Sequence, residues 1–299
     1  MNGLITIRGK KLYVETAGNE NAPVLLFLHG GPGEGCYSHS FYQKERLSKS
    51  VRWVSFDQRG VLRSEPLVND ETFRLQDIIE DIEVLRQKLG IEKWVVWGHS
   101  FGGYLAILYT QAYPLSVEAL IFESPSFDLD LSFRSLLHGA AKVFVTLGDD
   151  NNAIKSLRYA NGSYSTNIKV DMFLELSQKL GSNKDHLYFR EYESIYPQLV
   201  IPKEIQDLQE QSFIHLDKLK QEGLIYESLL TKLPHINVPT LLLTGAYDLV
   251  TCEKQINTYL EKVPKGELYQ FENSGHNPSW EEADAFSEKI VNYMKRLNQ

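Results

Sequence analysis

Short apolar runs alternate with amphipathic stretches along most of the chain. Continuous apolar runs such as 24–28 and 94–97 are typical of strands that are buried on both faces of a sheet. Near the start, two segments with alternating polar and apolar residues are separated by Gly9 and Lys10, which predicts a hairpin. The strands predicted in this way are 4–8, 11–16, 24–28, 51–56, 94–97, 119–122, 240–244 and 267–271.

Helical periodicity lies between these strands. Apolar residues recur at helical spacing from Leu75 to Leu89, and Gly90 follows where a C-terminal cap is expected. Further helices are predicted from about 104 to Pro114, over 252–263, and from about 280 to the end. Strands that alternate with helices predict an α/β fold with a mostly parallel central sheet covered by helices.

The middle of the chain has a different pattern. From about Asp128 to Lys232 there are helical patterns and aromatic residues, but no segment typical of a buried strand. We therefore expect a core formed by residues 1–127 and 231–299, with a helical cap inserted at 128–230.

Composition excludes several classes of function. The 299 residues carry 31 basic and 39 acidic side chains, a net charge of -8, without a basic cluster, so nucleic acid and anionic membranes are poor candidates as partners. The N-terminal segment lacks the apolar region of a signal peptide, and no apolar run could span a bilayer. Two cysteines, Cys36 and Cys252, do not suggest a disulfide framework. We expect a cytoplasmic protein, monomeric or a small homo-oligomer.

A candidate nucleophile lies between a predicted strand and a predicted helix. Gly98-His99-Ser100-Phe101-Gly102 matches the pattern Gly-Xaa-Ser-Xaa-Gly. In the strand–turn–helix setting this pattern is typical of a nucleophile elbow, in which a sharp turn exposes the serine at a helix N-terminus and leaves room only for glycine on either side. Ser100 is therefore the predicted nucleophile.

A serine hydroxyl needs a neighbouring base, which a histidine would supply. Elbow enzymes place the acid and then the histidine after the serine, which excludes the histidines up to His99. Of the later histidines, His276 follows the last predicted strand on a loop with Ser274 and Gly275, where catalytic residues of α/β proteins gather. His276 is the predicted base.

Two aspartates could orient this histidine. Asp248 follows the strand at 240–244, and a carboxylate there would fix the imidazole tautomer and stabilise the imidazolium. Asp128 follows the earlier strand at 119–122 and is the alternative. Asp248 is favoured.

A glycine-rich loop follows the strand at 24–28 and reads HGGPG. Acyl transfer needs two N–H donors aimed at the developing oxyanion, one of them from the residue after the nucleophile and one from an earlier loop. Phe101 and Gly31 are the predicted donors, and Gly30 is expected to contact the substrate.

Together, HGGPG, DQRG, GHSFGG, GAYD and SGH resemble the proline iminopeptidase group of α/β-hydrolases, across residues 29–276. The resemblance implies the α/β-hydrolase fold, a helical cap, a triad of Ser100, Asp248 and His276, and no cofactor or metal. It also implies release of an N-terminal residue, often proline, from a small-molecule or short-peptide substrate.

The substrate's ammonium is held in this group by cap glutamates, and Glu193 in the segment YFREYE is the match. Three features depart from the group: Leu249 where some relatives have a second glutamate, Leu62 in place of a glycine, and a cap rich in Tyr and Phe instead of Trp. An esterase, lactonase or other amide hydrolase with the same triad is therefore the alternative, and a ligand-binding protein without activity is a third reading.

Overall fold

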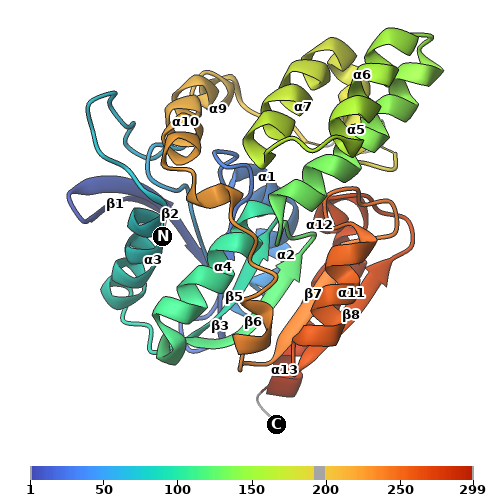
Figure 1. The fold of residues 1–299 in the computed structure, drawn as a ribbon. Coiled ribbons are helices and arrows are strands. Elements are labelled where there is room, and N and C mark those ends of the chain that lie inside the picture. Colours follow the sequence, from blue (N-terminus) through green and yellow to red (C-terminus); the bar gives the residue numbers. More distant parts are fainter. Residues whose placement is uncertain (1, 192–198, 298–299) are drawn as a thin grey trace.

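The structure is a computed structural model that describes residues 2–191 and 199–297. Eight strands form one sheet in the order β1-β2-β4-β3-β5-β6-β7-β8 (Figure 1). The strands are β1 Asn2–Ile7, β2 Lys10–Ala17, β3 Val24–Leu28, β4 Arg52–Phe56, β5 Trp94–His99, β6 Val117–Glu123, β7 Thr240–Gly245 and β8 Gly266–Phe271. Each lies within a few residues of a strand predicted from the hydrophobic pattern.

The sheet is parallel from β4 to β8, and β1 and β2 form an antiparallel hairpin that pairs with β4 at one edge. The predicted mostly parallel α/β fold is thus confirmed. Parallel strands need crossover connections, and the helices that supply them cover both faces.

Successive strand residues point to opposite faces, so the sheet separates two hydrophobic clusters. Leu26 and Leu28 of β3 join a cluster that includes residues of α3 and α4, whereas Leu25 and Phe27 join one that includes α13. The helices of the core are α1 Tyr37–His39, α2 Glu45–Leu47, α3 Leu75–Lys88, α4 Phe101–Ala112, α11 Glu253–Lys262, α12 Pro278–Glu281 and α13 Ala283–Leu297.

Three details differ from the predicted helices. Helix α4 begins at Phe101, immediately after Ser100. The C-terminal helix is two helices, α12 and α13, separated at Glu282, whose φ of -127° and ψ of 50° are not helical. The helical segment from Tyr37 to Leu47, with a π-helical turn at Ser40–Lys44, was not predicted, because its mixed apolar and polar residues lack clear periodicity.

The chain between β6 and β7 forms helices at one end of the sheet (Figure 1). These are α5 Leu129–Thr146, α6 Asp150–Asn161, α7 Thr166–Leu180, α9 Lys203–Gln206 and α10 Ser212–Glu222, and the described residues among them contain no strand. Leu136, Phe144 and Phe173 belong to a hydrophobic cluster of their own. The ends of this insertion meet, since Leu229 N–H donates to the Phe127 carbonyl at 2.8 Å.

Among the described helices, none is long and apolar enough to cross a membrane.

Candidate active site

The sequence-predicted site residues follow the carboxyl ends of parallel strands. Ser100 follows β5, and His276 lies on the loop after β8. Both line one cavity of about 320 Å³ together with Gly31 of the loop after β3. Residues far apart in the chain are therefore brought together at the end of the sheet that faces the insertion.

Ser100 has φ 52° and ψ -118°, a conformation that non-glycine residues rarely adopt. Tight backbone packing maintains this turn. A Cβ on Gly98 would lie 2.3 Å from the Gly102 carbonyl oxygen, and one on Gly102 would lie 2.0 Å from that of Leu28. Ser100 N–H also donates to the Glu123 carbonyl at 2.9 Å. The sequence therefore needs both flanking glycines for a serine to occupy this position.

The two predicted oxyanion donors lie on different elements next to Ser100, Phe101 on helix α4 and Gly31 on the loop after β3. Phe101 is the first residue of α4, so its N–H has no acceptor within the helix and lies at the positive end of the helix dipole. Gly31 has φ 109°, and a Cβ there would lie 2.5 Å from Gly33 N, so the loop requires glycine. A Cβ on Gly30 would lie 3.0 Å from the Cβ of Ser100, which places Gly30 against the serine.

His276 is buried and its ring contacts an aspartate. Its Nδ1 lies 3.0 Å from Asp248 Oδ1, and both side chains are almost fully inaccessible to solvent. A carboxylate only accepts hydrogen bonds, so this contact assigns the proton to Nδ1 and leaves Nε2 as the basic nitrogen.

Asp248 is well supplied with hydrogen-bond donors. Burial by itself raises the pKa of this carboxyl, but His276 and the backbone N–H groups of Val250 and Thr251 outweigh burial and hold its pKa below the ordinary value. Asp128, the alternative acid, instead caps α5 by accepting from Leu131 N–H at 3.0 Å. The structure brings Asp248, and not Asp128, to His276.

The loop that carries His276 is fixed from two sides. His276 N–H donates to the Tyr188 carbonyl at 2.6 Å, which ties the loop to the inserted segment. Glu281 accepts from Gly275 N–H at 2.7 Å and from Arg190 N–H at 2.8 Å, while Glu282 accepts from the Ser274 hydroxyl at 2.6 Å. His276 is thus positioned jointly by the core and by the insertion.

A second group of titratable side chains borders the same cavity and was not singled out from the sequence. Glu34 and His99 line the cavity, and Glu34 Oε2 lies 3.8 Å from His99 Nδ1. Burial raises the pKa of Glu34 to about 7, partly opposed by His276, and burial lowers the pKa of His99 well below its ordinary value. An acidic residue directly after HGGPG was the signal available for Glu34.

Behind this group lie His39 and Glu123, both fully buried. The ring centroids of His39 and His99 are 4.4 Å apart, and His39 Nε2 lies 3.7 Å from Glu123 Oε2. Possible metal-ligand atoms of Glu34, His39 and His99 all lie within 4.8 Å of one another. Among the described residues, this is the group whose donors could approach one cation.

Two other sequence predictions concern the substrate. Glu193, the expected ammonium ligand, lies outside the described residues. Leu249, which replaces a glutamate of some relatives, packs against Gly139 and belongs with the apolar residues of the insertion. The side chain after Asp248 therefore packs with the insertion, and it is not among the described residues that line the cavity at Ser100.

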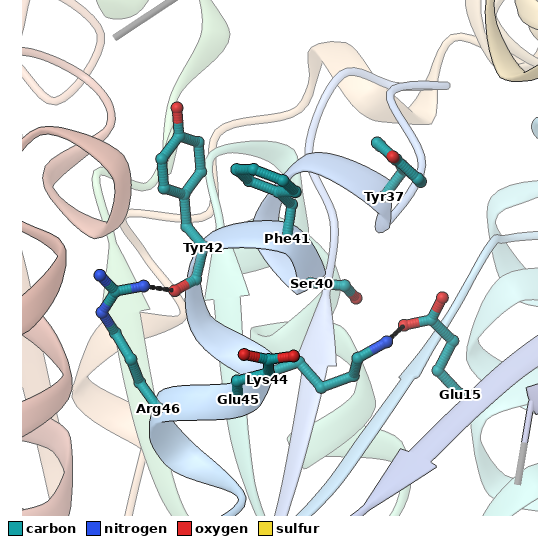
Figure 2. A pocket seen from close by; sticks show the side chains of 8 residues that line it. All are labelled: Glu15, Tyr37, Ser40, Phe41, Tyr42, Lys44, Glu45 and Arg46. Atoms are coloured by element: carbon teal, nitrogen blue, oxygen red, sulfur yellow. Dashed lines mark hydrogen bonds and ion pairs between the residues drawn. The ribbon is translucent and has the colours of Figure 1, made fainter. Parts of the chain in front are cut away.

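A larger cavity, of about 460 Å³, lies away from Ser100 (Figure 2). It is lined by Phe41 and by charged residues of both signs, and Figure 2 shows Lys44 paired with Glu15. None of the residues that line it is His276, Asp248 or Ser100. The cavity at Ser100 is consequently the candidate active site.

Comparisons with known proteins identify the family and the fold. Residues 23–283 match the family described as alpha/beta hydrolase fold. The proline iminopeptidase of Saccharolobus solfataricus is 29% identical over 96% of this chain and 88% of the relative. That of Xylella fastidiosa is 40% identical, but over 37% of this chain and 35% of the relative. A crystal structure of proline iminopeptidase from Mycobacterium smegmatis has a TM-score of 0.74 at 18% identity, covering 99% of this chain and 98% of that one.

Proposed function

Because this chain belongs to the α/β-hydrolase fold family, we propose that it is a serine hydrolase with Ser100, His276 and Asp248 as its catalytic triad. The observation that carries the proposal is the strained Ser100 in one cavity with His276, whose Nδ1 is 3.0 Å from the buried Asp248.

In this mechanism, Ser100 Oγ attacks the scissile carbonyl carbon while His276 Nε2 takes its proton. Asp248 keeps the imidazole in the tautomer that accepts this proton. The oxyanion is stabilised by the N–H groups of Gly31 and Phe101, which together supply several kcal/mol of transition-state stabilisation. His276 then protonates the leaving group. In the second half of the reaction, water attacks the acyl-enzyme while His276 Nε2 takes its proton, and His276 returns this proton to Ser100 Oγ as the acid product leaves.

The substrate proposed is a short peptide from which the N-terminal residue is released, as by the proline iminopeptidases to which the chain is similar. Residues 128–230 would act as a cap that excludes water and limits the length of the substrate. The hydrogen bond from His276 N–H to the Tyr188 carbonyl supports a cap that takes part in forming the site. The residues proposed for catalysis require no cofactor.

A second candidate is an esterase, lactonase or other amide hydrolase with the same triad. It is favoured by Leu249, because an apolar side chain beside Asp248 offers no ligand to a substrate ammonium.

One panel of substrates tests both candidates. Pro-, Leu- and Ala-p-nitroanilide would be compared with short-chain p-nitrophenyl esters, using wild-type protein and Ser100→Ala. We expect anilide turnover that Ser100→Ala abolishes, with fluorophosphonate labelling of wild type alone. Ester turnover without anilide turnover would select the second candidate. Absence of both turnover and labelling would contradict a serine hydrolase.

A further inference from the structure

Two hydrogen-bond acceptors face each other beside Ser100. His99 Nε2 lies 3.3 Å from the His276 carbonyl oxygen, which can only accept, so Nε2 carries the proton of the ring. Nδ1 then presents a lone pair, 3.8 Å from Glu34 Oε2. Within residues 2–191 and 199–297, no donor hydrogen-bonds to His99 Nδ1 or to the Glu34 carboxylate.

Such a pair favours a ligand that donates to both acceptors. Hydrogen bonds between N–H and an acceptor span about 2.9 Å, so one nitrogen can reach two acceptors at this spacing. Primary and secondary aliphatic ammonium groups both carry the two N–H donors that this requires. A positive charge would also compensate the Glu34 carboxylate, which is only partly exposed to solvent and has no cationic side chain among the described residues that line the cavity.

The charges around the cavity select the same kind of ligand. Asp185 is a second carboxyl group among the described residues that line it, and these include neither lysine nor arginine. A cationic group is therefore attracted to this cavity, and an anionic group is repelled.

The position of the pair fits the reaction. A single point, the Cβ that Gly30 lacks, would lie 3.0 Å from Glu34 Oε2, from His99 Nδ1 and from Ser100 Cβ. In an aminoacyl substrate, the α-nitrogen is two bonds from the carbonyl carbon that the serine attacks. The pair is thus close enough to the nucleophile to bind that nitrogen.

We propose that Glu34 and His99 together bind the α-ammonium group of the residue whose carbonyl Ser100 attacks. This assignment rests on the proposed function and gives it a specificity-determining residue in the core, Glu34, on the loop directly after HGGPG. The charge that Leu249 does not supply comes from this loop, on the opposite side of the nucleophile in sequence.

A metal ion suits the same atoms less well. Glu34, His39 and His99 spread their ligand atoms over as much as 4.8 Å, whereas ligands of a tetrahedral zinc ion lie about 3.4 Å apart. The His39 ring is also stacked on Phe27, with centroids 4.6 Å apart, which restricts its movement toward the other two.

Binding of a matched pair of ligands tests the assignment without requiring turnover. Prolinamide and cyclopentanecarboxamide both carry an amide on a five-membered ring. They differ in one ring atom, which is the ammonium nitrogen in prolinamide and a carbon in cyclopentanecarboxamide. Their Kd values would be measured by NMR titration at about pH 7.5, where the amine is largely protonated and Glu34 largely ionised. We expect wild type to bind prolinamide at least about tenfold more tightly, the contribution of one charge-assisted hydrogen bond.

The variants identify the carboxylate responsible. Glu34→Gln should bring the ratio of the two Kd values close to one, and Glu34→Asp should restore part of it. Asp185→Asn, which removes the same charge from the same cavity, should keep most of the preference. Equal losses in Glu34→Gln and Asp185→Asn, or an equal affinity of wild type for both ligands, would overturn the proposal.

Two further results distinguish a failure to fold from a loss of binding, and the ammonium site from the proposed aminopeptidase activity. If Glu34→Gln does not fold, Glu34→Asp decides, because an unchanged ratio in this shortened variant would contradict direct contact. If prolinamide is preferred and Glu34 is required, but no aminoacyl anilide is hydrolysed, the ammonium site stands and the aminopeptidase assignment fails.

Discussion

Asp248 shows how a buried carboxylate remains ionised next to a histidine. Its oxygens accept from His276, Val250 and Thr251, so the charge is stabilised inside the protein. Asp128 accepts from a helix N-terminus instead. The two aspartates that the sequence left as alternatives therefore differ in what their removal should change.

We expect Asp248→Asn to lower kcat on the order of 10⁴-fold, because the amide no longer fixes the imidazole tautomer. Asp128→Ala should leave kcat within a fewfold and lower the free energy of unfolding by about 1 kcal/mol, as for loss of a helix cap. Steady-state kinetics and urea denaturation of both variants provide the measurement. The reverse pattern would make Asp128 the acid.

Glu123 predicts a pH dependence of stability. Burial raises the pKa of this carboxyl from 4.5 to about 8, although hydrogen bonds from Ser279 and Trp97 oppose the shift, and the nearest imidazole is His39. A carboxyl with a higher pKa in the folded state binds a proton on folding. Its contribution therefore decreases as the pH rises from about 4.5 to about 8, by on the order of a few kcal/mol.

Urea denaturation at intervals from about pH 5 to pH 8 would test this in wild type and Glu123→Gln. The glutamine cannot ionise, so the free energy of unfolding of the variant should fall less steeply with pH. Parallel profiles would show that Glu123 does not titrate in this range.

The triad candidates were predictable from sequence because each follows a strand and the order serine, acid, histidine excludes most alternatives. Glu34 and His99 were not recognised as a pair. They are 65 positions apart, and the parallel pairing of β3 with β5 brings the loop after β3 next to His99 at the end of β5. A linear sequence does not specify such contacts.

At the scale of the element, the turn between β5 and α4 combines a strained backbone with the side chain that we propose as the nucleophile. A residue held at φ 52° and ψ -118° stores about 1–3 kcal/mol of strain unless it is glycine. The strain exceeds the roughly 0.5–1 kcal/mol that glycine costs through the entropy of the unfolded chain. Glycine would therefore give the more stable protein at position 100, whereas the proposed reaction needs the serine hydroxyl.

We expect Ser100→Gly to exceed Ser100→Ala in free energy of unfolding by about 1 kcal/mol, since both lack the hydroxyl and only glycine relieves the strain. Ser177 in α7 supplies the control, because in a helix glycine is about 1 kcal/mol less stable than alanine. Urea denaturation of the four variants gives both differences. The same sign at both positions would contradict a strained turn.

The strands were predicted most accurately, since the central ones are short apolar runs between breakers and the two hairpin strands alternate polar and apolar residues. The segment from Tyr37 to Leu47 was missed because several of its buried side chains, such as His39 and Gln43, are polar. Their burial depends on tertiary partners, which hydrophobic periodicity does not reveal.

At the scale of the whole molecule, two neighbouring glutamates hold the His276 loop in different ways. One also contacts the insertion, and the other contacts the loop alone. Glu281 accepts from both Gly275 and Arg190, whereas Glu282 accepts from Asn273 and Ser274 of the loop itself. The first glutamate joins two parts of the protein and the second stabilises one of them.

Amide hydrogen exchange should distinguish these roles. Glu281→Ala should accelerate exchange at Arg190 as well as at Gly275, because both N–H groups lose their acceptor. Glu282→Ala should accelerate exchange in the loop and leave Arg190 close to wild type. Unchanged exchange at Arg190 in Glu281→Ala would show that the insertion is held by other contacts.

The insertion leaves the core after Phe127 and returns at Leu229, where one backbone hydrogen bond joins the two crossings. In evolutionary terms, this junction would let one helical segment replace another as a unit between β6 and β7, provided that the new segment keeps the contacts that Tyr188 and Arg190 make with the His276 loop and with Glu281. Descendants of one ancestral gene could thus keep the sheet and its loops while a single contiguous stretch of DNA, the one that encodes the residues between these two crossings, diverges.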